Sequence, residues 1–155
     1  GQGRLRIRSD RAQVSTVVAI NTVSPAQEVT APVLFSNYTI GDGDIRYLAT
    51  TTGAAADGLM PCSVYLITEP STLSRVDINT VRVTITNSAT AQITGYPGQS
   101  SAIIPLKTDK SVEIDITDTV AEPVLLKITL PESSGTVLNL SVAFLTLPGS
   151  TARNG

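Results

Sequence analysis

Apolar and polar residues alternate with a period of two in several parts of this chain. The clearest cases are residues 81–86, 112–117 and 138–142, where valine, isoleucine or leucine takes every second position. No long stretch repeats apolar residues at the three- and four-residue spacing of a helix. Because successive side chains of a strand point to opposite faces, each segment predicts a strand with one buried and one polar face.

Runs of β-branched, aromatic and aliphatic residues predict further strands. Glycine, proline, asparagine and aspartate separate these runs and supply turn chemistry. The sequence therefore predicts an all-β fold, an antiparallel β-sandwich of about eight to ten short strands, of which the jelly roll is one form. The additional predicted strands are residues 14–20, 33–40, 45–51, 63–68, 91–94, 102–106 and 124–130.

Two local features predict irregular positions in the sheets. Ile78 stands at an even position, whereas the alternation that begins at Val81 uses odd ones. A straight strand cannot bury both sets on one face, so we expect a bulge or bend near residues 79–80. Pro105 interrupts an apolar run and cannot donate a ladder hydrogen bond, which predicts an edge strand there.

The length of 155 residues suits one domain with its own core. We expect this domain at residues 13–148, with a basic arm or edge strand at 1–12 and a flexible tail at 149–155. The predicted core residues are Val17, Ile20, Leu34, Leu48, Val64, Leu66, Val83, Ile85, Ile104, Ile114, Ile116, Leu126, Ile128, Leu140, Val142 and Leu145.

Charge is scarce. Charged residues make up 15% of the chain, against about a quarter in an average soluble protein, and serine and threonine occupy the polar faces instead. The net charge of −2 attracts no nucleic acid to the chain as a whole, so nucleic acid is not an expected partner. A surface rich in hydroxyl groups suits a protein that lies against other copies or outside cells, although a charge-poor monomer explains it too.

Positive charge gathers at the N-terminus. Arg4, Arg6, Arg8 and Arg11 are four of the eleven basic residues. One interpretation is an arm that docks on a neighbouring subunit through an acidic surface. The other is a plain edge strand whose arginines face water and protect the edge. Without interleaved aromatic residues, four arginines do not indicate nucleic-acid binding.

The chain has no histidine and a single cysteine, Cys62. A Ser-His-Asp triad and an internal disulfide are therefore excluded, and zinc would lack ligands. We expect Cys62 to be a buried apolar residue. We also expect no enzymatic activity, no cofactor and no metal. No apolar stretch approaches the roughly 18 residues of a membrane-spanning helix, so no span is expected.

Two groups of carboxylates admit a chemical interpretation. Asp42 and Asp44 stand two apart in a glycine-rich stretch that could hold calcium, but Asp-Gly is also hairpin chemistry, which we favour. Glu113, Asp115 and Asp118 could supply a general acid, but a solvated strand face is the better interpretation.

Candidate binding loops lie at residues 53–58 and 95–101. In the second loop Tyr96 could form a platform for a ligand and Gly98 a contact point, although a tyrosine that packs on its own turn explains the same residue. Four tyrosines, two phenylalanines and no tryptophan in the whole chain count against a site that stacks sugars.

These features favour a non-enzymatic structural or assembly protein, a virus or phage virion component such as a capsid, head-decoration or tail protein. Its expected partners are copies of itself, with a trimer favoured, and other virion or surface-assembly proteins. The alternative is an extracellular adhesin or ligand-binding β-sandwich module. The expected location is the virion or the extracellular space.

Overall fold

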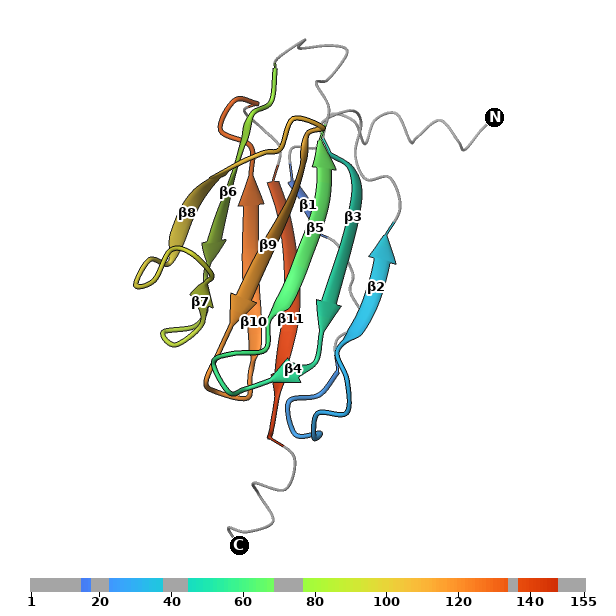
Figure 1. Cartoon of the computed structure of the whole chain (residues 1–155), viewed down its shortest axis with the longest axis vertical. Helices are drawn as coiled ribbons and strands as arrows, with labels where there is room; N and C mark the ends of the chain where they lie inside the picture. Colours follow the sequence, from blue (N-terminus) through green and yellow to red (C-terminus); the bar gives the residue numbers. More distant parts are fainter. Residues whose placement is uncertain (1–14, 18–22, 38–44, 69–76, 134–136, 148–155) are drawn as a thin grey trace, which may run out of the picture.

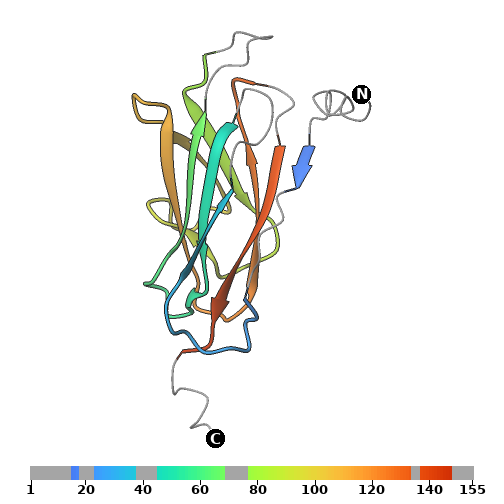
Figure 2. The same cartoon turned by 90° about the vertical axis from the view of Figure 1, so that its right-hand side faces the viewer.

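The computed structural model describes residues 15–17, 23–37, 45–68, 77–133 and 137–147. These residues form eleven strands in two sheets that pack face to face (Figures 1 and 2), and none of them is helical. The predicted all-β sandwich is confirmed. It has one strand more than the ten predicted segments, namely the two-residue β4, whereas the equally short β7 falls within the predicted strand at residues 91–94.

The first sheet has the order β1-β11-β10-β6-β8, and β4 also pairs with β11. β10 runs antiparallel to both of its neighbours, and so does β6. β1 and β4 instead run parallel to β11, at opposite ends of that long strand. The strands of this sheet are β1 (Ser15–Val17), β4 (Ala54–Ala55), β6 (Thr80–Ile85), β8 (Ser101–Pro105), β10 (Pro123–Thr129) and β11 (Val137–Leu145).

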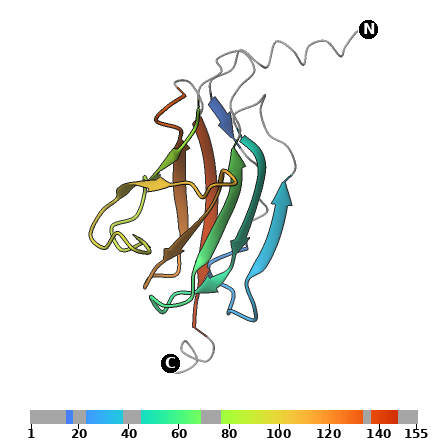
Figure 3. The ribbon, with the colours of Figure 1, turned by 45° about the horizontal axis from the view of Figure 1, so that its top comes forward.

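The second sheet has the order β2-β3-β5-β9-β7 and is antiparallel throughout. β2 and β7 are its two edges, so the turns around β7 lie at the side of the sandwich away from β2 (Figure 3). Its strands are β2 (Val33–Asn37), β3 (Ile45–Thr52), β5 (Cys62–Thr68), β7 (Gln92–Ile93) and β9 (Ser111–Thr117).

The core lies between the two sheets and contains the residues that the alternation assigns to one face. Phe144 is its largest fully buried side chain and was not among the predicted core residues. The predicted core residues that are buried are Leu48, Val64, Leu66, Val83, Ile85, Ile114, Ile116, Leu126, Ile128, Leu140, Val142 and Leu145.

Leu34 does not belong to the core, and its prediction was wrong. Its side chain is 57% exposed, because β2 is an edge strand and Leu34 pairs with Thr51 on the outward side. Ile104 is only half-buried, because β8 is also an edge strand. Ile20 and the side chain of Val17 lie outside the described residues.

The buried positions change from even to odd between Ile78 and Val81. Both side chains are fully buried, although three positions separate them, and β6 begins between them at Thr80. Pro105 is the last residue of β8, which is the edge of the first sheet, as predicted. The chain therefore enters the first sheet at residue 80 with its odd positions facing inward.

Two side chains of the second sheet bond to the backbone of β11 across the core. Thr52 Oγ1 accepts a hydrogen bond of 2.6 Å from the Ala143 amide. Cys62 is completely buried, as expected, and its thiol donates to the Ala143 carbonyl at 3.4 Å. Burial raises the pKa of this thiol to about 11. These contacts hold the two sheets in register at one level of the sandwich.

Candidate functional site

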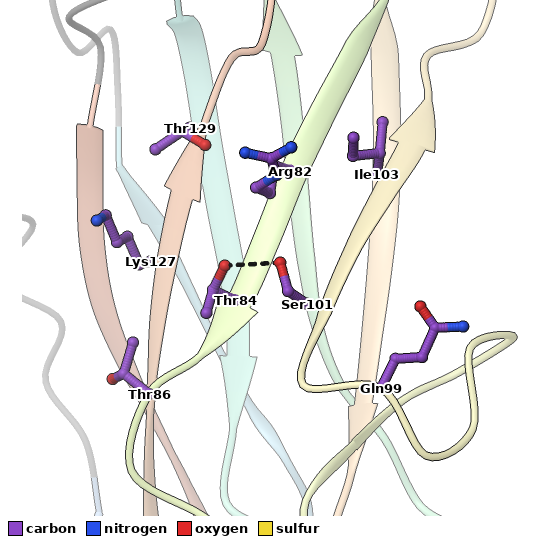
Figure 4. A pocket seen from close by; sticks show the side chains of 8 residues that line it. All are labelled: Arg82, Thr84, Thr86, Gln99, Ser101, Ile103, Lys127 and Thr129. Carbon is purple, nitrogen blue, oxygen red and sulfur yellow. Dashed lines mark hydrogen bonds between the residues drawn. The ribbon is translucent and has the colours of Figure 1, made fainter.

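An open hollow lies on the outer face of the first sheet (Figure 4). Its volume is about 730 Å³, and it is open to solvent. Strands β6, β8 and β10 and the turn before β8 form its floor. The residues that line it are Arg82, Thr84, Thr86, Gln99, Ser101, Ile103, Lys127 and Thr129.

Alternation along β6 and β10 places these side chains outside. Val81, Val83 and Ile85 are buried, so the residues between them face solvent. On β10 the same rule turns Lys127 outward next to the buried Ile128. The polar half of each alternating segment thus becomes the floor of the hollow, which we name the cationic face.

Charge on the cationic face has one sign. Arg82 pairs with Thr129 across β6 and β10, and Thr84 pairs with Lys127. The two cations are therefore diagonal neighbours, at a typical separation of about 7–8 Å between their Cα atoms. None of the eight lining residues is acidic. The positive charge on this face is thus not neutralised by any residue of the lining.

Hydroxyl groups occupy the space around the cations. Thr84 and Ser101 face each other across β6 and β8, and their hydroxyl oxygens are 3.0 Å apart (Figure 4). Each hydroxyl can both donate and accept, so the face offers adaptable hydrogen bonds between its two charges.

Two large apolar side chains flank the hydroxyl groups. Ile103 on the edge strand is 48% exposed, and Leu125 on β10 is 44% exposed. The cationic face therefore combines two charges, hydroxyl groups and exposed apolar surface.

The opposite face of the sandwich carries carboxylates. Glu113 and Asp115 lie on β9 and point away from the core, as predicted for a solvated strand face. Asp115 accepts a 2.7 Å hydrogen bond from the Ser63 hydroxyl. A hydrogen bond with Asp115, burial and charge repulsion raise the pKa of Glu113. We name this surface the acidic face.

Asp118 does not share that solvated position, and its assignment to a strand face was wrong. It is 1% exposed, because it follows Ile114 and Ile116 at the same parity and turns inward just beyond the end of β9. The Thr90 hydroxyl donates to its Oδ1 at 2.7 Å, and Glu122 is its carboxyl neighbour.

The loop between β7 and β8 holds Tyr96 and Gly98. Tyr96 is half-buried and packs against the core, and its amide donates to the Ile93 carbonyl at 2.9 Å. Gly98 has a φ of 80°, which favours glycine. The structure thus favours the interpretation of Tyr96 as a residue that packs on its own turn.

The other candidate loop, residues 53–58, lies largely against the core. Ala54, Ala55 and Ala56 are buried, and the first two form β4. Asp57 closes the following turn by accepting from the amides of Leu59 and Met60. These hydrogen bonds lower the pKa of Asp57. Its carboxylate is therefore engaged within its own turn.

Several predicted residues lie outside the described residues. These include the four arginines of the N-terminal arm, Arg4, Arg6, Arg8 and Arg11, and the calcium alternative at Asp42 and Asp44. Within the described ranges, no three or more Cys, Asp or Glu side chains come together as metal ligands. The same ranges contain no apolar helix long enough to span a membrane.

Comparison with known proteins gives structural matches only. No family model and no curated protein matches the chain. Among solved structures, the D0–D1 domains of intimin match 68% of this chain at 14% identity, with a TM-score of 0.49. The D00–D0 domains of intimin match 79% at 17% identity and 0.42. The adhesin InvE of Yersinia pseudotuberculosis matches 79% at 15% identity and 0.41.

The matches cover 49%, 52% and 33% of those chains, so this sequence spans about half of their length or less. At this degree of similarity no functional residue is carried over from them to this chain.

Proposed function

We propose that this chain is a non-enzymatic, extracellular binding module of the adhesin kind, which contacts an acidic protein surface through its cationic face. The observation that carries this proposal is the pair Arg82 and Lys127, which stand among hydroxyl groups with no acidic residue in the lining. A carboxylate of a partner protein would be complementary in charge to these two side chains.

The shape of the face supports a macromolecular partner. The hollow is wide and open, and its floor is a regular sheet. Small-molecule sites are more enclosed and bury most of their ligand. The exposed Ile103 and Leu125 provide apolar contact on either side of the charged centre. A protein surface supplies both kinds of contact at once.

The absence of histidine from the whole sequence supports the non-enzymatic part of the proposal. Histidine is the side chain that most often performs general acid–base catalysis near neutral pH. The one cysteine is buried, and its pKa is about 11, so it does not supply a thiolate nucleophile.

Binding to poly-L-glutamate tests the cationic face. Arg82→Ser and Lys127→Ser should each weaken binding by about two- to fivefold, the usual effect of one exposed charge pair. Lys107→Ser is the matched control, because Lys107 is exposed but does not line the hollow. Equal losses in all three variants, or binding that survives Arg82→Ser plus Lys127→Ser, would overturn the proposal.

Self-assembly is a second candidate, and one observation favours it. The cationic and acidic faces lie on opposite sides of the sandwich, so one copy can place its cations against the carboxylates of the next. This extends the prediction of a homo-oligomer or a virion component. Size-exclusion chromatography with light scattering at low and high salt distinguishes the candidates: a monomer at both salt levels excludes self-assembly.

A further inference from the structure

Two turns meet at one end of the sandwich and bring two carboxyl groups together. The turn after β6 contributes Ser88 and Thr90, and the turn after β9 contributes Asp118 and Glu122. The Thr90 hydroxyl is 2.7 Å from Asp118 Oδ1 and 3.3 Å from Glu122 Oε2. The Ser88 hydroxyl donates to Glu122 Oε2 at 2.6 Å. The Thr90 hydroxyl therefore lies within hydrogen-bond distance of both carboxyl groups.

The backbone fixes both acidic residues. The Asp118 carbonyl accepts from the Gly58 amide, and the Glu122 carbonyl accepts from the Phe144 amide, each at 2.9 Å. On the other turn, the amides of Thr90 and Ala91 donate to Ser88 Oγ. The arrangement is thus built into the fold.

One oxygen of this cluster is unsatisfied. Asp118 is 1% exposed, and its Oδ1 accepts from Thr90 and from the Val120 amide. Its Oδ2 is buried and accepts no hydrogen bond from any described residue. A buried polar atom without a partner is costly and requires an explanation, such as an ion.

The neighbour of Asp118 is another carboxyl group. Burial, followed by a hydrogen bond with Glu122, raises the pKa of Asp118. A hydrogen bond from Asp118 lowers the pKa of Glu122. Carboxylates only accept hydrogen bonds, so two of them in contact require a proton or a cation between them. At acid pH a proton on Asp118 meets this need, and at neutral pH a cation can take its place.

We propose that Asp118 and Glu122 bind one calcium ion, with the Thr90 hydroxyl oxygen as a neutral ligand, while Ser88, whose oxygen already accepts from two amides, positions Glu122. Oxygen ligands alone favour hard cations such as calcium and magnesium over zinc and copper. Calcium accepts six to eight oxygens in irregular geometry, whereas magnesium demands a near-ideal octahedron. Two carboxylates, one hydroxyl and water suit calcium, the ion with the less regular geometry.

Binding would link the two turns. Cys62 lies near enough that the Asp118 charge contributes, after burial, to its raised pKa, and Asp57 stands next to the Gly58 that holds Asp118. Calcium would neutralise the charge concentrated at this end of the sandwich. The end that holds Asp118 should therefore become more resistant to local opening.

Calcium titration of the EDTA-treated full chain at neutral pH tests the site, by isothermal titration calorimetry and thermal unfolding. Calcium at ten times its Kd should raise Tm by about 3–6 °C. Asp118→Asn and Glu122→Gln should each abolish the rise. Glu113→Gln is the control, because it neutralises one carboxylate of the acidic face and should keep the full response.

The variants are designed to fold. In Asp118→Asn the new side chain keeps an oxygen for Thr90 and Val120 and offers an amide hydrogen to Glu122, so the variant imitates the protonated carboxyl group. Should that variant fail to fold, Glu122→Gln alone decides, because its side chain is partly exposed. No heat of binding and no Tm shift at millimolar calcium would overturn the proposal, and so would a response that survives both substitutions.

Discussion

At the scale of single residues, Asp118 and Cys62 share one physical condition. Both are almost completely buried, and burial is the main reason that both have a raised pKa. Removal from water disfavours the ionised form of each side chain. For Asp118 this links stability to pH, and for Cys62 it suppresses reactivity.

The first prediction concerns Asp118 and pH. A raised pKa means that the folded chain holds the proton more tightly than the unfolded chain, so this residue stabilises less as pH rises. We compare the unfolding free energy of the metal-free wild type with that of Asp118→Asn. This difference should fall as the pH rises above 3.8, the ordinary pKa of aspartate, and should level off once the pH exceeds the raised pKa of Asp118. Urea unfolding in EDTA between about pH 4 and pH 8 measures it.

Comparison with Asp118→Asn is needed because the pKa values of other carboxyl groups are lowered, so their effect on stability changes with pH in the opposite direction. The lowered pKa values of Asp57 and Glu122 add stability that is lost at acid pH. The amide group introduced by Asp118→Asn can still donate to Glu122, so the difference isolates position 118. A difference that stays constant with pH would show that Asp118 ionises as freely in the folded chain as in the unfolded one.

The second prediction concerns Cys62. With no exposed surface and a pKa of about 11, the thiol should react with Ellman's reagent at pH 8 only after the chain is unfolded in urea. Cys62→Ala should lower the unfolding free energy by about 1–2 kcal/mol, because it removes a packed sulfur atom. Rapid reaction of the folded protein would show that this part of the core opens readily.

At the scale of elements, the pattern predicts strands well where apolar and polar residues alternate strictly. Residues 81–86 and 112–117 are such segments, and β6 and β9 follow them with the expected face buried. Alternation gives no answer at residues 33–35, because three consecutive residues are apolar and the pattern does not show which of them face inward. The same alternation continues one position past β9 and places Asp118 inside, at the parity of Ile114 and Ile116.

The third prediction uses this contrast. Leu34→Thr should change the unfolding free energy by less than about 0.5 kcal/mol, because Leu34 lies on the outward side of an edge strand. Leu126→Ala should cost about 2–5 kcal/mol, because Leu126 is packed between the sheets. Urea unfolding compares the two. A large loss at Leu34 would mean that the side chain is covered in solution.

At the scale of the whole molecule, function depends on which strands become neighbours. The outward positions of Arg82 and Lys127 follow from the sequence pattern, but their proximity depends on β6 lying between β8 and β10. The same holds for Asp118 and Ser88, which 30 positions of sequence separate. Strand order is set by long-range packing of the two sheets, and local patterns contain little information about it.

The fourth prediction tests whether the two charged faces recognise each other. A contact between two different faces is heterologous. Each copy therefore presents its cationic face to one neighbour and its acidic face to another. If copies associate in this way, Arg82→Glu with Lys127→Glu should abolish association, and so should Glu113→Lys with Asp115→Lys. In the first variant both faces are acidic, and in the second both are basic.

An equimolar mixture of these two double variants should associate again, because the basic face of one meets the acidic face of the other. Light scattering at low salt measures this recovery, and added salt should weaken it by screening. If the wild type associates but the mixture does not, another surface holds the copies together. If the wild type is monomeric at every salt concentration, the cationic face is free for the acidic protein partner proposed above.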